Sequence, residues 1–175
     1  TLGLEGLKKA AALAVLNARY LKELLKEKGY RVPYDGPSMH EFVAQPPQGF
    51  RALDLAKGLL ELGFHPPTVY FPLIVKEALM VEPTETEAKE TLEAFAEAMG
   101  ALLKKPKEWL ENAPYSTPVR RLDELRANRS PKLTCFDEEK GGGAWAPPPA
   151  FLAYFTTGRP AFFQPSRPPL MLCTL

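Results

Sequence analysis

Apolar residues recur at helical spacing in three stretches of the chain, and polar or β-rich segments separate these stretches. Residues 4–28 are predicted to form a helix whose middle, residues 10–16, is apolar on every side. Such a helix is typically buried, running within or between domains, and Gly29 is expected to end it. Residues 51–62 form an amphipathic pattern, with leucines along one face and charges along another, and Gly63 is expected to end that helix.

The third helical stretch, residues 85–104, has the most explicit start signal. Thr84 is placed to cap the helix, and Glu87 stands where a capping box needs its reciprocal acid. Apolar residues repeat at helical spacing along it, while acids gather at its start and lysines at its end, as the helix dipole favours. The pattern therefore predicts a helix that begins directly after Thr84.

Short β-rich segments lie between these helices. Residues 30–34 are predicted as an edge strand, because their proline has no N–H to donate to a central ladder, and residues 39–44 as a second, alternating strand. Residues 68–75 are predicted as a bulged or edge strand that pairs with residues 78–81. The order α-β-β-α-β-β-α predicts an α+β fold, a two-layer sandwich with helices on one face of a mostly antiparallel sheet.

The regular patterns weaken in the last third of the chain. Residues 119–125 are predicted as a final surface helix. The last 35 residues hold seven of the chain's 19 prolines and a run of three glycines, and we expect them to be disordered, or a product of a shifted reading frame or of readthrough. The predicted organisation is a connecting helix (1–29), a small α+β domain (30–105), an extension (106–140) and a tail (141–175).

Composition narrows the classes of function. The 175 residues are 45% apolar and 25% charged, which is ordinary for a globular protein. The net charge of +1 gives no electrostatic argument for binding nucleic acid or an acidic membrane, and no apolar run approaches the ~18 residues of a membrane helix. Cys135 and Cys173 are too few for a disulfide framework or a metal site. We expect a cytoplasmic protein with no metal, nucleic-acid or membrane partner.

Histidines and arginines supply some of the candidate site residues. His40, on the predicted second strand, is either a satisfied core or interface histidine or a residue that faces a cleft. His65 and Thr68 belong to an irregular loop stiffened by two prolines, and such loops often carry binding groups. Arg120 and Arg121 are either a solvated pair or a binding site for a carboxylate.

Acidic residues near the third helix give a second group of candidates. Glu82, Glu85 and Glu87 together resemble a carboxylate cluster that binds metal or moves protons. The alternative is that Glu85 and Glu87 occupy the first helical turn, where acids are stabilised by the helix dipole. Glu82 and Thr84 are kept as candidates for the side of a substrate cleft.

Six sequence motifs, in order, resemble glycine decarboxylase, the P-protein of the glycine cleavage system, over about residues 1–138. They are Gly3-Leu4 with Ala14-Val15-Leu16-Asn17-Ala18-Arg19-Tyr20, His40-Glu41-Phe42, Asp54-Leu55-Ala56-Lys57, Gly63-Phe64-His65-Pro66-Pro67-Thr68, Met80-Val81-Glu82-Pro83-Thr84-Glu85 and Pro114-Tyr115-Ser116-Thr117-Pro118-Val119-Arg120-Arg121-Leu122-Asp123. The last motif is similar to the close of the β subunit (subunit 2) in the split bacterial type.

The resemblance implies the small C-terminal domain of a fold-type-I pyridoxal-phosphate enzyme. In that family glycine forms a Schiff base with the cofactor, carbon dioxide leaves, and the aminomethyl group passes to a lipoyl carrier protein. The family's catalytic lysine follows a histidine, whereas here Glu41 follows His40 and Pro66 follows His65. The resemblance therefore implies that a missing large domain holds most of the cofactor, that this chain has no catalytic residue, and that it is inactive alone.

The resemblance also implies partners, and two other functions stay open. The implied partners are the remainder of the same subunit, the other P-protein subunit and the lipoyl carrier protein. The alternatives are a non-catalytic α+β interaction module, and the small domain of another fold-type-I aminotransferase or decarboxylase. Without a large domain, the apolar helix 4–28 is expected to make the chain self-associate.

Overall fold

A computed structural model describes residues 1–131 of the chain, and the predicted tail, 141–175, lies outside these residues. Its elements follow the order α1 (Gly3–Glu27), β1 (Phe42–Ala44), α2 (Ala52–Glu61), β2 (Thr68–Val69), β3 (Leu79–Val81), α3 (Lys89–Leu102), α4 (Lys107–Asn112) and α5 (Glu124–Arg129). The chain forms two compact units: Thr1–Ser116 holds α1 to α4, and the unit that starts at Thr117 holds α5.

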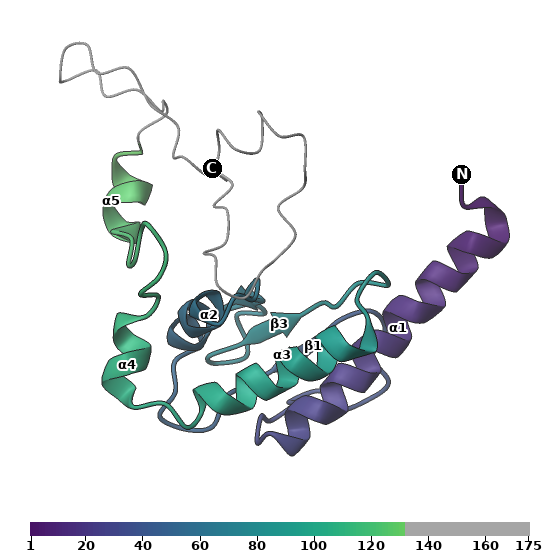
Figure 1. The fold of residues 1–175 in the computed structure, drawn as a ribbon, viewed down its shortest axis with the longest axis horizontal. Coiled ribbons are helices and arrows are strands. Elements are labelled where there is room, and N and C mark those ends of the chain that lie inside the picture. The colour runs from purple at the N-terminus through teal and green to yellow at the C-terminus, as the bar shows by residue number, and fades with distance from the viewer. Residues whose placement is uncertain (132–175) are drawn as a thin grey trace, which may run out of the picture. The chain divides into compact units, whose positions relative to one another are not determined.

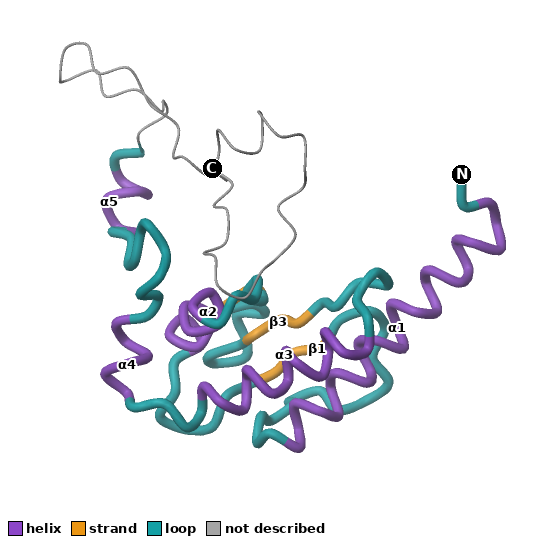
Figure 2. The backbone as a smooth tube through the Cα atoms, viewed as in Figure 1, coloured by secondary structure: helices purple, strands orange, loops and turns teal. Residues whose placement is uncertain are grey.

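The first unit has the predicted α+β fold, built on a small antiparallel sheet. The three strands lie in the order β1-β3-β2, and Figure 2 shows how short they are beside the helices. Phe42 of β1 pairs with Val81 of β3, while Thr68 of β2 pairs with Met80. Helix α1 packs against α3 and β1, and α2 packs against α3, α4 and β2.

The core lies where these helices meet the sheet. On α1, Ala18, Leu21 and Leu25 are buried at the spacing of one helical face. The other elements contribute a set of large, fully buried side chains: Leu55 and Leu59 of α2, Leu79 of β3, and Met99 and Leu102 of α3. Burial of each such side chain stabilises the fold by roughly 1.5–3 kcal/mol.

The N-terminal half of α1, residues 3–17, lies outside this core, so the burial predicted for residues 10–16 is not provided within the described part of the chain. Leu4, Leu7 and Leu16 are exposed, Leu16 by 60%, and Figure 1 shows this half of the helix projecting beyond the rest of the unit. Within the described part of the chain, the buried residues of α1 begin only at Ala18. The predicted end of the helix is confirmed, because Gly29 takes a left-handed conformation with φ of 97°.

The strands are shorter than the sequence predicted. Residues 30–34 contribute only an isolated bridge from Arg31 to Gln45, and the strand predicted from residue 39 begins at Phe42. The predicted pairing of 68–75 with 78–81 is correct only for Thr68 and Val69, which pair with Met80 and Leu79. Tyr70 has φ of 61° and turns the chain out of the β conformation.

Two predicted helix starts were wrong. Helix α3 begins at Lys89 rather than 85, and its N-cap residue, Ala88, makes no side-chain capping bond. The hydroxyl of Thr84 instead pairs with that of Thr86 at 2.6 Å. The helix predicted over 119–125 is displaced to α5, where the Asp123 carboxylate accepts a hydrogen bond from the backbone N–H of Arg126.

None of the helices in residues 1–131 combines the length and apolar character that crossing a membrane requires.

Candidate functional site

Two adjoining hollows in the first unit share part of their lining. The larger has a volume of about 500 Å³ and the smaller about 350 Å³. Glu82, Pro83 and Thr84 line both, so we call these three residues the shared wall. The larger hollow is otherwise lined by the loop 63–68 and by residues of α1, β3 and α3, and the smaller by α1 together with Met39, His40 and Glu85.

The structure brings all five predicted site residues to these hollows. His65 and Thr68 line the larger hollow, His40 lines the smaller, and Glu82 and Thr84 belong to the shared wall. The sequence separates them into three motifs, so their meeting depends on the fold.

Strand pairing explains why His40 lies near Glu82. Because β1 and β3 are antiparallel and Phe42 pairs with Val81, the residues before β1 and the residues after β3 lie at the same end of this strand pair. His40 Nε2 lies 3.8 Å from Glu82 Oε1, and both side chains are about half exposed. His40 therefore precedes β1 rather than standing within the predicted strand, and its imidazole is available at the surface.

The larger hollow joins an apolar interior to a polar rim. Leu21, Phe64, Met80, Leu92 and Phe95 form apolar lining, and the rings of Phe64 and Phe95 meet edge to face with centroids 5.6 Å apart. The rim carries hydroxyl, imidazole and carboxylate groups from the loop 63–68, the shared wall and α3. Apolar lining with a few convergent polar groups is typical of small-molecule sites.

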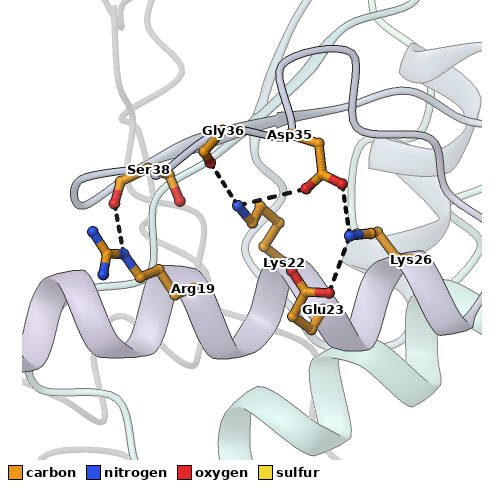
Figure 3. A network of polar contacts seen from close by, with 7 residues as sticks. All are labelled: Arg19, Lys22, Glu23, Lys26, Asp35, Gly36 and Ser38. Atoms are coloured by element: carbon orange, nitrogen blue, oxygen red, sulfur yellow. Dashed lines mark hydrogen bonds and ion pairs between the residues drawn. The ribbon is translucent and has the colours of Figure 1, made fainter.

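A polar network ties the segment that leads to His40 onto α1 (Figure 3). The buried Lys22 donates to the Gly36 carbonyl at 2.9 Å, and Arg19 Nε donates to the Ser38 carbonyl at 2.9 Å. Lys26 donates to Asp35 at 2.7 Å, and this bond lowers the pKa of the Asp35 carboxyl. These bonds hold the turn 35–38 against α1. Because His40 follows this turn closely in the chain, α1 also positions His40.

A second link joins α1 to α3 beside the larger hollow. Tyr20 Oη donates to Glu93 Oε1 at 2.6 Å. This hydrogen bond raises the pKa of Tyr20 and lowers the pKa of Glu93, because it stabilises the neutral phenol and the ionised carboxylate. The hydrogen bond holds together α1 and α3, the two helices that flank the larger hollow.

Sequence analysis missed Asn17 as a site residue. Its side-chain amide donates to the Thr84 carbonyl at 2.8 Å and to the Glu87 carbonyl at 3.1 Å. It thereby ties the shared wall and the following turn to α1. A polar side chain next to the buried Ala18, within a largely apolar stretch, was the available signal.

The structure also corrects the account of the acidic residues. Glu85 and Glu87 lie before α3 and are exposed, so they do not occupy its first turn. Among residues 1–131, no group of three or more histidine, cysteine, aspartate or glutamate side chains is arranged to hold a metal ion. Arg120 and Arg121 belong to the second unit, and neither lines the two hollows.

The lining of the two hollows does not fit pyridoxal phosphate. A bound cofactor of this kind needs a lysine for its aldehyde and donors or positive charge for its phosphate. In the described part of the chain, neither lysine nor arginine lines either hollow, whereas Glu82 and Glu87 place carboxylates at the larger one. The two hollows are therefore no binding site for the whole cofactor.

The comparisons with known proteins agree with this fold. Residues 10–116, more than half of the chain, match the family described as "Glycine dehydrogenase, C-terminal domain". The chain belongs to this family, which depends on pyridoxal phosphate.

Individual relatives show which members of the family the chain is similar to. The chain is 99% identical over 138 residues to "Probable glycine dehydrogenase (decarboxylating) subunit 2" of a Thermus thermophilus strain, covering 79% of this chain and 29% of that relative. It is 59% identical over 140 residues to the protein of the same name from Caldanaerobacter subterraneus subsp. tengcongensis, covering 76% of this chain and 29% of the relative. The chain thus spans less than a third of the length of these relatives.

A solved structure shows the same likeness in three dimensions. The crystal structure of glycine decarboxylase (P-protein) of the glycine cleavage system, in inhibitor-bound form, superposes with a TM-score of 0.54 at 30% sequence identity. The match covers 58% of this chain and 23% of that one. The resemblance inferred from the six motifs is confirmed.

Proposed function

We propose that this chain is the C-terminal part of subunit 2 of a glycine dehydrogenase (decarboxylating). The whole enzyme removes carbon dioxide from glycine with the help of pyridoxal phosphate and passes the aminomethyl group to a lipoyl carrier protein. The observation that carries the proposal is the 99% identity over 138 residues to a relative of that name. The chain by itself is inactive, because within its described residues the lining of the hollows offers no lysine for the cofactor.

Within that enzyme, the two hollows face the substrate cleft. His40, His65, Thr68, Glu82 and Thr84 form the side of the cleft that this domain supplies, and the cofactor is held mainly by the remainder of the subunit. The support is geometric: hydroxyl, imidazole and carboxylate groups from separate motifs converge on one apolar-lined region.

An exposed surface supports one of the proposed partners, and the family supports the other two. The exposed leucines on the N-terminal half of α1 are covered by the remainder of the subunit, because a row of exposed apolar side chains marks an interaction surface. The other P-protein subunit and the lipoyl carrier protein are the further partners, and the enzyme works in the cytoplasm.

Reconstitution tests the activity. Full-length subunit 2 carrying this C-terminal region, combined with its partner subunit, is expected to catalyse glycine-dependent carbon dioxide exchange with a lipoyl carrier, while the 175-residue chain shows none. Exchange with other amino acids but not with glycine would replace this proposal with another fold-type-I enzyme. A full-length complex without activity toward any amino acid would favour a non-catalytic interaction module.

Substitutions in the reconstituted enzyme test the site. Glu82→Gln and His40→Gln remove charge or basicity from the shared wall region and are expected to change kcat/KM for glycine by about tenfold or more. Glu111→Gln, on the exposed face of α4, is the matched control and is expected to leave kcat/KM unchanged. Equal effects of all three variants would argue against a role of the two hollows.

A further inference from the structure

Residues 84–88 carry the sequence signals of a helix start, yet they remain outside α3. Thr84 and Glu87 have the residue types and spacing of a capping box. The helix nevertheless begins four residues later than these signals indicate, and its N-cap, Ala88, makes no side-chain capping bond. Something in the tertiary structure therefore outweighs a strong local preference.

Asn17 is the side chain that contacts this segment from α1. Its amide group donates to the Thr84 carbonyl at 2.8 Å and to the Glu87 carbonyl at 3.1 Å, across 67 and 70 residues of sequence. In a helix that began at residue 85, the Thr84 carbonyl would accept from the N–H of Ala88, and the Glu87 carbonyl from that of Thr91. Asn17 thus donates to two carbonyls that the longer helix would use as acceptors, and it does so while the Thr84 carbonyl also accepts from the Glu87 N–H at 3.3 Å in the present turn.

We propose that Asn17 is a positioning residue: it holds residues 84–88 out of α3 and so keeps Glu82, Pro83 and Thr84 in place as the shared wall. Without Asn17, Thr84 and Glu87 cap the helix, and α3 is extended so that it begins at residue 85. The residues of the shared wall then change position. The inference rests on the proposed function only for the role of the wall in a substrate cleft.

The chemistry requires an asparagine. A primary amide presents two N–H donors on one nitrogen without a charge, which matches two carbonyl oxygens three residues apart. Asp at this position would set carboxylate oxygens against those carbonyls. Leu has a similar size and no donor. Both replacements therefore free the segment while keeping the number and branching of the side-chain heavy atoms.

Hydrogen exchange of the backbone amides, measured on the 175-residue chain, tests the inference. In Asn17→Leu, the amides of Ala88, Lys89 and Glu90 are expected to exchange at least about tenfold more slowly than in the wild type. Each of these amides gains a helical carbonyl partner four residues before it. A contact that only fastens the loop predicts the opposite direction, since its loss would speed exchange. Faster or unchanged exchange at these amides overturns the proposal.

Further variants separate the cause from general damage. Asn112→Leu removes a similar amide, which donates to the Glu108 carbonyl within α4, and is expected to leave exchange at residues 88–90 unchanged. The double variant Asn17→Leu/Thr84→Val lacks the capping hydroxyl and is expected to lose the slowing. If Asn17→Leu does not fold, Asn17→Asp is expected to show the same slowing, and its absence there overturns the proposal.

The readout is independent of enzyme activity. Slowed exchange in a protein whose full-length form shows no glycine activity would sustain the role of Asn17 and reject the proposed function. Glycine activity together with unchanged exchange would do the reverse.

Discussion

The two halves of α1 share one helix and a similar number of leucines, but their surroundings differ. Leu21 and Leu25 in the C-terminal half are buried among α3 and the sheet, whereas Leu4, Leu7 and Leu16 in the N-terminal half are exposed. An apolar helical pattern therefore predicts that a helix face is covered by a partner surface, but it does not show whether that partner belongs to the same domain. The core supplies it for one half, and we propose that the rest of subunit 2 supplies it for the other.

The sharpest test of the contrast replaces one leucine in each half. Leu25→Ala is expected to lower the free energy of unfolding by about 2–5 kcal/mol, because Leu25 is fully buried and its loss leaves a cavity. Leu16→Ala is expected to change it by no more than about 0.5 kcal/mol. Urea denaturation followed by circular dichroism measures both. Equal losses would mean that the two halves are packed alike.

Self-association probes the exposed half directly. The double variant Leu4→Gln/Leu7→Gln is expected to weaken self-association of the 175-residue chain by about tenfold or more, because each leucine buried in a contact contributes roughly 1.5–3 kcal/mol. Sedimentation velocity over a range of concentrations provides the measurement. Leu122→Gln/Leu125→Gln removes two equally exposed leucines from the second unit and serves as control. A wild-type chain that stays monomeric at high concentration contradicts this prediction.

Close packing in the body of the first unit gives a third test. A Cβ added at Gly58 on α2 would lie 2.6 Å from Leu102 Cδ2, and Leu102 is itself fully buried. Gly58→Ala is therefore expected to destabilise the fold by about 1–2 kcal/mol, after a gain in helix propensity partly offsets the overpacking. Gly36→Ala meets open space and is expected to be nearly neutral in thermal unfolding. A stabilised Gly58→Ala variant would show that the interface between α2 and α3 is loosely packed.

Tyr30, buried after the end of α1, gives the smallest effect and a pH dependence. Tyr30 Oη donates to the Met99 carbonyl at 3.1 Å, so Tyr30→Phe is expected to cost about 1 kcal/mol near neutral pH. Burial raises the pKa of Tyr30 in the folded state. Its contribution is thus complete below the unfolded pKa of about 10 and is lost as pH rises above that value toward the folded pKa.

The difference between wild type and Tyr30→Phe is therefore expected to shrink as unfolding is measured at increasing pH above about 10. Tyr34→Phe, at an exposed tyrosine, is the control and is expected to follow the wild type throughout. A constant difference between wild type and Tyr30→Phe across the alkaline range would show that Tyr30 ionises alike in both states.

Prediction from sequence was strongest where local signals and tertiary contacts agree. The bounds of α1 and α2 and the left-handed Gly29 follow from apolar periodicity and glycine chemistry. It failed where a distant group competes, as at the start of α3, where Asn17 binds the carbonyls of Thr84 and Glu87.

The candidate site divides in the same way. The residue types and loop chemistry of His65, Thr68, Glu82 and Thr84 marked them in advance. Their convergence on two adjoining hollows depends on the antiparallel pairing of β1 with β3 and on the polar bonds that hold the turn 35–38 to α1. Neither could be derived from single motifs, since both join residues far apart in the chain.

The sequence by itself determined the α+β class, the main helices and the family, because periodicity, glycine stops and ordered motifs are local properties of the chain. Only the tertiary structure decided which half of α1 is buried, where α3 begins and how the shared wall faces His40. These features depend on contacts between segments distant in sequence, where two side-chain hydrogen bonds of about 0.5–1.5 kcal/mol each are enough to outweigh a local capping preference of about 1 kcal/mol.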